Sequence, residues 1–142
     1  MTGPREITDF AGNWQLTRVI HDAKAGQVFQ ADGAAYLTTS ETGLIYEEAV
    51  TLRIPGQPVI KGTRKYLWQD AGDEIDVRFE DGRFFHRLKL GKSEATDHHD
   101  CPPDSYDVVY DFSKWPRWAA RWTVSGPRKS YEMKTEYAAL AK

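Results

Sequence analysis

Several features that would narrow the class of this protein are missing from its sequence. Cys101 is the one cysteine among 142 residues, so the chain cannot form an internal disulfide. The uncharged apolar runs are a few residues long, far below the ~20 residues that a membrane helix needs. The N-terminal segment lacks the basic start and the apolar stretch of a secretion signal. We therefore expect a cytoplasmic protein with no membrane partner.

An excess of positive charge is also lacking. Nineteen Lys and Arg residues stand against 21 Asp and Glu residues, which leaves a net charge of −2. Proteins that bind nucleic acids usually carry a basic excess, so we expect no nucleic-acid partner. A Gly-rich phosphate-binding loop is missing as well, so side chains would have to bind any anionic ligand.

The ligands for a metal or a haem are incomplete. His98, His99, Asp100 and Cys101 are ligand types in a row, but adjacent residues of a strand point to opposite faces. No second cysteine or spaced histidine pair completes a zinc site, and a haem-attachment cysteine pair is missing. A haem held by His86 or His99 alone would face a polar, charged interior. We expect no metal and no other cofactor.

Aromatic residues and regular alternation are abundant. Phe, Trp and Tyr make up 13% of the chain. Turn signals such as Asp32-Gly33, Asp81-Gly82 and Gly126-Pro127 recur about every eight to twelve residues, with apolar and polar residues alternating between them. This pattern predicts about ten antiparallel strands, the size at which a closed barrel can hold one small ligand. We predict an all-β, up-and-down barrel in one domain, residues 1–142, after a short helical turn at Ile7–Phe10.

Two segments allow local predictions. Asp81-Gly82 is typical of a two-residue hairpin loop, after which Phe84 and His86 would share the inner face of one strand. Tryptophans within Trp115–Trp122 are spaced as on a helix face, but Pro116 and the Thr-Val-Ser-Gly-Pro that follows favour a turn and then a strand. We predict a strand in this segment.

Short motifs in order along the chain resemble those of a known family. The first, Gly12-x-Trp14-x-x-x-Arg18, contains the Gly-x-Trp signature that opens lipocalins and other calycins. The others are Gly43-Leu44-x-Tyr46-x-Glu48, Arg64-x-Tyr66-x-Trp68, Asp81-Gly82-Arg83-x-Phe85-His86, His99-x-Cys101-x-x-Asp104-x-Tyr106, Tyr110-x-Phe112, Trp118-x-x-x-Trp122 and Gly126-Pro127-Arg128-Lys129-x-Tyr131. Together they resemble an uncharacterised calycin-like family, domain of unknown function 6314, over nearly the whole chain. The resemblance implies a lipocalin-like barrel and no particular activity. The family tends to place an Arg after the last Tyr, whereas Ala138 follows Tyr137 here.

Polar side chains on faces that should be buried mark a candidate site. Arg18 shares a face with Trp14, and Glu48 shares one with Tyr46. A buried charge must pair, reach water or meet a ligand, because leaving it unpaired is costly. In a structural interpretation Arg18 bridges to Glu48 and, by resemblance to calycins, packs on Trp14. In a functional interpretation a ligand pocket is lined by Arg18, Glu48, Arg64, Tyr66, Trp68, His86, His99, Asp104, Tyr106, Trp122, Arg128, Lys129 and Tyr131.

The chemistry of these residues indicates the class of ligand. The arginines and His86 would donate hydrogen bonds, Glu48 and Asp104 would hold them in place, and aromatic rings would form apolar walls. Arg128 and Lys129 would form either a solvated basic turn or an anion clamp at the rim of the barrel. We therefore predict a small-molecule-binding barrel for an anionic or polar-aromatic ligand.

An enzyme that uses the same pocket is the alternative. His86 or His99, oriented by Asp104 or Glu48, would then transfer protons. A Cys101 nucleophile activated by His99 is awkward, because residues two apart on a strand lie about 6–7 Å apart. We favour a small buried hydrophobe for this cysteine. A filled barrel without a cavity, and a homodimer, stay open.

Overall fold

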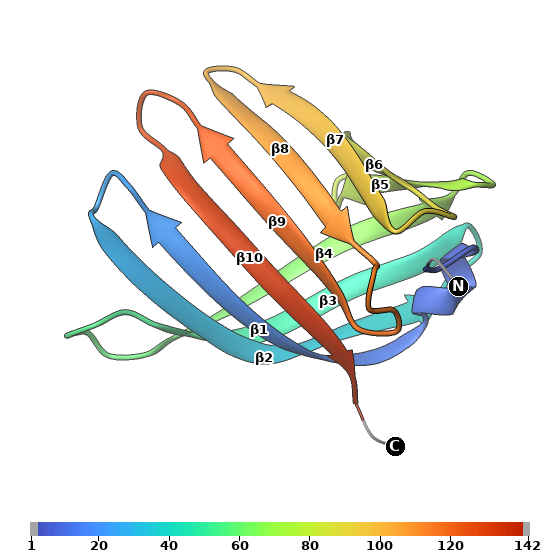
Figure 1. The fold of residues 1–142 in the computed structure, drawn as a ribbon, viewed down its shortest axis with the longest axis horizontal. Helices are drawn as coiled ribbons and strands as arrows, with labels where there is room; N and C mark the ends of the chain where they lie inside the picture. The colour runs from blue at the N-terminus through green and yellow to red at the C-terminus, as the bar shows by residue number, and fades with distance from the viewer. Residues whose placement is uncertain (1–2, 141–142) are drawn as a thin grey trace.

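The computed structural model describes residues 3–140 and contains one short 3-10 helix and ten strands (Figure 1). The helix is η1 (Ile7–Phe10), and the strands are β1 (Gly12–Asp22), β2 (Gln27–Thr39), β3 (Gly43–Arg53), β4 (Ile60–Asp70), β5 (Glu74–Phe79), β6 (Phe84–Lys89), β7 (Glu94–Cys101), β8 (Asp104–Asp111), β9 (Trp118–Ser125) and β10 (Ser130–Ala139). The predicted helical turn and the strand in the tryptophan-rich segment are confirmed. Within the described range, no helix has the length and apolar character to cross a membrane.

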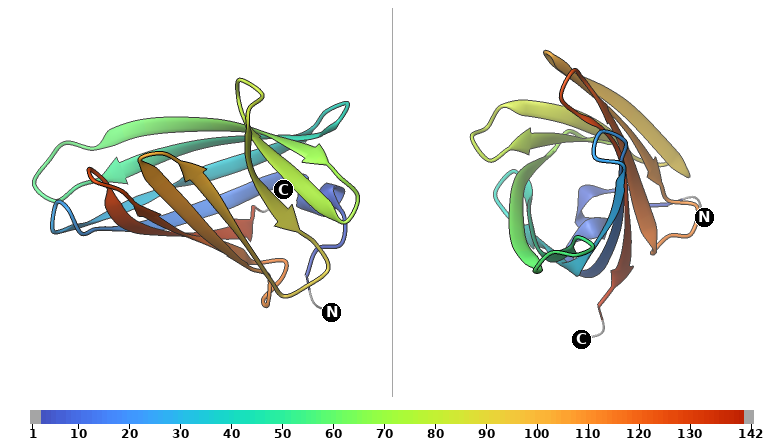
Figure 2. Two further views of the ribbon diagram at one scale, coloured as in Figure 1. Left: turned by 90° about the horizontal axis from the view of Figure 1, so that it is seen from above. Right: turned by 90° about the vertical axis from the view of Figure 1, so that its left-hand side faces the viewer.

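The strands form one antiparallel sheet that curls into a nearly closed barrel. Their order is β6-β5-β4-β3-β2-β1-β10-β9-β8-β7, so consecutive strands pair and β1 also pairs with β10. β6 and β7 are the two edges of the sheet and meet at a seam (Figure 2). This arrangement confirms the predicted all-β, up-and-down barrel of about ten strands.

The helix η1 closes one end of the barrel. Phe10 is fully buried, and its ring centroid lies 5.3, 5.1 and 5.2 Å from those of Trp68, Trp115 and Trp118. The indole N–H of Trp14 donates to the carbonyl oxygen of Phe10 at 2.9 Å. Figure 2 (right) looks in from the opposite side and shows η1 at the far end. An aromatic plug therefore forms the floor of the barrel.

The inner face of β2 is lined by small residues. Ala31, Gly33 and Ala35 point inward, where neighbouring strands present larger side chains such as Trp14. A Cβ atom at Gly33 would overlap the carbonyl oxygen of Ala49 on β3, so this close approach of two strands requires glycine. Asp32-Gly33, a predicted turn signal, therefore lies within β2 and does not form a turn.

The loop between β5 and β6 is longer than predicted. It comprises Glu80–Gly82, because the N–H of Phe79 donates to the carbonyl oxygen of Arg83 at 2.8 Å. Gly82 has a φ of 91°, the left-handed conformation that closes three-residue hairpin loops and that glycine adopts readily. The predicted two-residue Asp81-Gly82 loop is therefore wrong by one residue.

A β-bulge in β6 follows from this loop. Arg78 of β5 pairs with Phe84, whereas Val77 pairs with His86, so Phe85 is the extra residue. Both Phe85 and His86 turn inward and are 7% and 2% exposed, whereas Phe84 is 38% exposed. The prediction that Phe84 shares the inner face with His86 is wrong, because the alternation restarts at the bulge.

Candidate functional site

A cavity of about 680 Å³ occupies the barrel interior above the aromatic plug. Its aromatic lining consists of Tyr46, Tyr66, Trp68, Phe79, Phe84, Phe85, Tyr106, Tyr110, Trp118, Trp122, Tyr131 and Tyr137. Its charged and other polar lining includes Arg18, Glu48, Arg64, Arg83, His86, His99, Asp100 and Thr135. A filled barrel without a cavity does not fit this structure.

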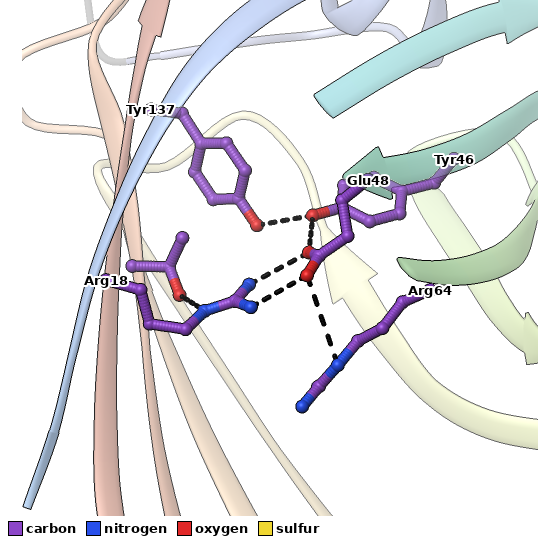
Figure 3. Close-up of polar contacts among 6 residues, drawn as sticks. Arg18, Tyr46, Glu48, Arg64 and Tyr137 are labelled. Atoms are coloured by element: carbon purple, nitrogen blue, oxygen red, sulfur yellow. Dashed lines mark hydrogen bonds and ion pairs between the residues drawn. The ribbon is translucent and has the colours of Figure 1, made fainter. Parts of the chain in front are cut away.

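Arg18 and Glu48 form a buried, two-pronged ion pair inside the barrel (Figure 3). The Nη1 and Nη2 atoms of Arg18 donate to Oε2 and Oε1 of Glu48 at 2.7 and 2.8 Å. The Nε atom donates to Oγ1 of Thr135 at 2.8 Å. The hydroxyl of Tyr46 donates to Oε1 of Glu48 at 2.6 Å and lies 2.9 Å from the hydroxyl of Tyr137. This network ties β1, β3 and β10 together across the interior.

Both partners of this pair are ionised. Burial opposes the charge of the Glu48 carboxylate, but the hydrogen bonds and charge of Arg18 outweigh burial and lower the pKa of this carboxyl. Burial also opposes the charge of Arg18, and Glu48 outweighs it and raises the pKa of the guanidinium. Burial and the Glu48 charge raise the pKa of Tyr137 to about 12, so its hydroxyl is protonated at neutral pH.

Trp14 packs against other tryptophans, and within the described residues Arg18 does not stack on it, contrary to the prediction from calycin resemblance. Its ring lies 5.9 and 5.8 Å, between centroids, from the rings of Trp115 and Trp118. In the described part of the chain no cation–π contact joins Arg18 to Trp14, since the guanidinium is held by Glu48 and Thr135. The ion pair, not stacking on a ring, positions Arg18.

Arg64 on β4 forms a long ion pair with the same carboxylate but no hydrogen bond. Its Nε atom lies 4.0 Å from Oε2 of Glu48, beyond hydrogen-bond distance, and Glu48 already accepts three hydrogen bonds. Within residues 3–140 the guanidinium of Arg64 has no hydrogen-bond partner, and its terminal nitrogens point away from Glu48 (Figure 3). The side chain is 47% exposed and lines the cavity. Arg64 therefore holds free donors at the cavity surface.

His86 is a buried histidine with one unpartnered nitrogen. Its Nε2 lies 2.7 Å from the hydroxyl of Tyr110, whereas Nδ1 has no partner in the part of the chain that the structure describes. Burial lowers the pKa of His86 to about 3 and raises the pKa of Tyr110, so both groups are neutral at pH 7. If Tyr110 donates to Nε2, only the hydrogen on Nδ1 is left unpaired. In the other tautomer Nε2 donates to Tyr110, and both the Nδ1 lone pair and the Tyr110 hydroxyl hydrogen are left unpaired. We assign the first arrangement.

Near-parallel rings line one side of the cavity. Phe85 stacks between Phe79 at 4.5 Å and Trp122 at 5.0 Å, with interplanar angles of 21° and 12°. Tyr66 lies 5.8 Å from Phe85 at 27°. The bulge in β6 puts Phe85 at the centre of this stack. The lining is thus apolar and flat on this side and polar around Arg18, Glu48 and Arg64.

Most of the predicted site residues line the cavity, and three do not. Those at the cavity are Arg18, Glu48, Arg64, Tyr66, Trp68, His86, His99, Tyr106, Trp122 and Tyr131. Asp104 and Lys129 instead pair at a hairpin rim, with Nζ 3.5 Å from Oδ2, and Lys129 donates to the hydroxyl of Tyr106 at 3.2 Å. Arg128 is exposed on the same hairpin as Lys129. Asp104 therefore holds Lys129 and does not hold the cavity residues, because it begins β8 at the barrel edge.

Sequence reasoning omits three members of the charged network. Tyr46 precedes Glu48 by two residues on the same face, so strand alternation alone could have identified it. Thr135 and Tyr137 also share an inner face, but their contacts with Arg18 and Tyr46 exist only because β10 pairs with β1. No local sequence signal indicates that pairing.

Cys101 and its neighbouring histidines do not form a metal cluster. Cys101 is exposed at the end of β7, contrary to the predicted buried hydrophobe, and lines the cavity together with His99. His98 points outward between the carboxylates of Asp107 and Asp100, at 2.6 and 2.8 Å. Across residues 3–140 no three His, Cys, Asp or Glu side chains gather as metal ligands.

Comparison with known proteins identifies the fold and leaves the activity open. Residues 10–139 match the model of a family described as a family of unknown function (DUF6314). None of the curated proteins matches the sequence. The solved structure of S-type phycobiliprotein lyase CPES from Guillardia theta is similar with a TM-score of 0.66 and 10% identity, covering 96% of this chain and 91% of that chain. A redesigned β-barrel, mFAP1, bound to DFHBI gives a TM-score of 0.45 and 12% identity over 94% and 98% of the two chains. At 10% identity the first likeness concerns the fold alone.

Proposed function

This chain belongs to the family of unknown function DUF6314, and we propose that it binds a small anionic aromatic molecule inside its barrel. One observation carries the proposal. Among the described residues the guanidinium of Arg64 has no hydrogen-bond partner at the cavity surface, and its ion pair with Glu48 is long, at 4.0 Å.

The balance of charge in the cavity favours an anion. Arg18 and Glu48 cancel, Arg83 pairs with Asp81 at 2.8 Å, and Asp100 contacts Nε2 of His98 at 2.8 Å. Arg64 is left with a positive charge and a planar fork of donors, which suits a carboxylate or a sulfonate. An anion at this position would be partly shielded from water, so its attraction to Arg64 would exceed that of a surface pair.

The apolar lining and the size of the cavity support an aromatic ligand. The cavity of about 680 Å³ lies within the range of about 300–1,000 Å³ that small-molecule sites span. Rings of Tyr66, Trp122 and Tyr131 line it and offer area on which a planar group can pack. An anionic group at Arg64 and a ring against these walls would use both parts of the lining.

The geometry favours binding over acid–base catalysis. A proton-transfer histidine would need a carboxylate partner and a nitrogen open to the cavity. The partner of His86 is the Tyr110 hydroxyl, and the low pKa of His86 makes it a poor base. Asp104 is held by Lys129, and Glu48 by Arg18.

Two dyes with the same rings test the proposal. 8-Anilinonaphthalene-1-sulfonate carries a sulfonate, whereas N-phenyl-1-naphthylamine has no charge. We expect Arg64→Met to weaken binding of the sulfonate dye about 10- to 150-fold, which corresponds to ~1.5–3 kcal/mol for a hydrogen bond to a charged group. Binding of the uncharged dye should not change, since it gains nothing from Arg64. Fluorescence titrations of both dyes measure the two effects.

The matched control is Arg121→Met, which removes an exposed arginine from the outer face of β9. It changes net charge equally and should leave both titrations as in the wild type. Loss of both dyes in Arg64→Met would show that Arg64 shapes the pocket without recognising charge. Equal sulfonate binding in Arg64→Met and wild type would refute the proposal.

A further inference from the structure

The barrel wall is incomplete between β6 and β7. Within residues 3–140 the sheet runs from β6 around to β7, and no backbone ladder joins these two edges. One hydrogen bond joins β6 directly to β7, from the backbone N–H of Arg87 to Oδ2 of Asp97 at 2.6 Å, and inside the barrel His86 of β6 contacts the hydroxyl of Tyr110 of β8 at 2.7 Å. Figure 2 (left) shows β6 and β7 diverging from the loop that connects them. Side chains hold the seam within the described residues, so it is the weakest contact between neighbouring strands in the barrel wall.

The cavity extends to the loop end of this seam. Hairpin loops gather at the barrel end opposite η1, and Arg83 and Pro102 line the cavity from the loops on either side of the seam. In the described structure, the loops at 23–26, 54–59 and 126–129 contribute no lining residue. The opening of the cavity thus lies toward the β5–β6 and β7–β8 hairpins.

Two residues of the outer face support an opening that continues into the seam. The ring of Phe84 lies on the outer face, 5.2 Å from the guanidinium carbon of Arg87, yet Phe84 lines the cavity. Asp100 bonds the outward-pointing His98 and also lines the cavity. An outer residue can border an inner cavity where the cavity opens between strands, and Phe84 and Asp100 lie at the loop ends of β6 and β7, where the seam meets the rim. Phe84 and Asp100 stand on opposite sides of such a passage.

Phe85 closes the seam from inside. The bulge turns its ring inward, where it meets His99, Tyr106 and Trp122 at centroid distances of 5.2, 6.1 and 5.0 Å. These three residues belong to β7, β8 and β9, beyond the seam from Phe85. The Phe85 ring therefore spans the gap between β6 and β7 that no backbone ladder closes among the described residues.

We propose that ligands enter and leave the cavity sideways, between β6 and β7, with the Arg87–Asp97 bond holding the seam and the Phe85 ring as its gate. The proposal relies on the proposed function for the existence of a ligand and not for its charge. A passage through the wall also accommodates an aromatic molecule longer than the cavity, with its outer part lying between Phe84 and Asp100.

Stopped-flow fluorescence with the two dyes tests this route. Asp97→Ala removes the hydrogen bond from the Arg87 N–H to Asp97 that joins β6 to β7. Among the described residues, Asp97 does not line the cavity. We expect the association and dissociation rate constants to rise together, by about three- to tenfold, with the dissociation constant unchanged. Asp76→Ala is the matched control, because Asp76 contacts the same Arg87 at 3.2 Å from within the β5–β6 hairpin. It should leave both rates as in the wild type.

Asp97→Asn provides a second variant that keeps an acceptor oxygen and should give intermediate rates. Wild-type rates in both Asp97 variants, with dye binding intact, would overturn the sideways route and leave the proposed function standing. If Arg64→Met binds both dyes with wild-type affinity, anion recognition is refuted. The association and dissociation rate constants of the uncharged dye would still decide the route. If the wild type binds neither dye, both proposals fail.

Discussion

At the residue scale, Glu48 organises the polar interior of the barrel. Its carboxylate accepts two hydrogen bonds from Arg18 and one from Tyr46, and it is 3% exposed. A buried carboxylate with saturated partners is stable only while those partners remain. We therefore expect Arg18 to have a structural role, and Arg64, which is half exposed and has no hydrogen bond among the described residues, to be the residue that meets a ligand.

Arg18→Met should separate these roles. The substitution leaves Glu48 buried without its main partner, so we expect the free energy of unfolding to fall by ~3–5 kcal/mol. Arg64→Met should change it little, because Glu48 keeps its three hydrogen bonds. The double variant Arg18→Met/Glu48→Met should recover most of the loss, since it strands no charge. Urea unfolding measures all three, and equal loss in Arg18→Met and Arg64→Met would contradict this division.

At the scale of elements, side-chain contacts stabilise the β5–β6 and β7–β8 hairpins beside the seam. The alternation of apolar and polar residues does not predict these contacts. The bulge in β6 turns Phe85 into the interior, and the outer face of β7 carries His98 between two carboxylates. Asp107 lies directly across from His98 on β8, so this contact is a cross-strand pair. It joins edge strand β7 to the rest of the sheet.

The His98 pair should make the β7–β8 hairpin sensitive to pH. Hydrogen bonds to Asp107 and Asp100 raise the pKa of His98 above its usual 6.5. A raised pKa contributes stability that is complete below about pH 6.5 and is lost as the pH rises through the raised value. We expect His98→Gln to be less stable than the wild type near pH 5.5, with the two converging near pH 9. Urea unfolding at both pH values tests this, and a constant difference would contradict it.

At the scale of the whole molecule, the barrel encloses a histidine that is neutral at pH 7 because burial lowers its pKa to about 3. His86 is 2% exposed and packs edge-on against Trp122 at 4.9 Å. Protonating it would place a charge in the apolar lining next to Phe85, so above about pH 3 the proton binds chiefly to the unfolded chain. His86 thus gives the fold a sensitivity to acid that begins below the ordinary histidine pKa of 6.5.

His86→Phe should reduce this sensitivity. The pKa of His86 is about 3 in the folded protein against an ordinary 6.5, so between these values only the unfolded chain binds the proton. Stability should therefore fall as the pH drops from 6.5, by up to about 1.4 kcal/mol per pH unit from this group. The variant loses the Tyr110 hydrogen bond at every pH but should show a shallower acid decline. Thermal melts from about pH 7 to pH 4 compare the slopes, and parallel slopes would exclude His86 as the source.

Local sequence patterns are sufficient to predict the class of fold and most of the inner face. Period-two alternation between turn signals is enough to predict antiparallel strands, and polar residues in phase with apolar ones are enough to place Arg18, Glu48 and His86 inside. Both inferences are local, because strand geometry repeats every two residues. The single domain, the cytoplasmic location and the absence of a nucleic-acid partner stay predictions.

Which of these residues come into contact depends on strand register and on closure of the barrel. The bulge that exchanges Phe84 for Phe85 depends on the register between β5 and β6, which the added loop residue shifts. Thr135 reaches Arg18 because β10 closes on β1, and Asp104 meets Lys129 because two hairpins end side by side. These contacts join segments far apart in the chain, so their geometry follows from barrel closure and register, which no local pattern of side chains encodes.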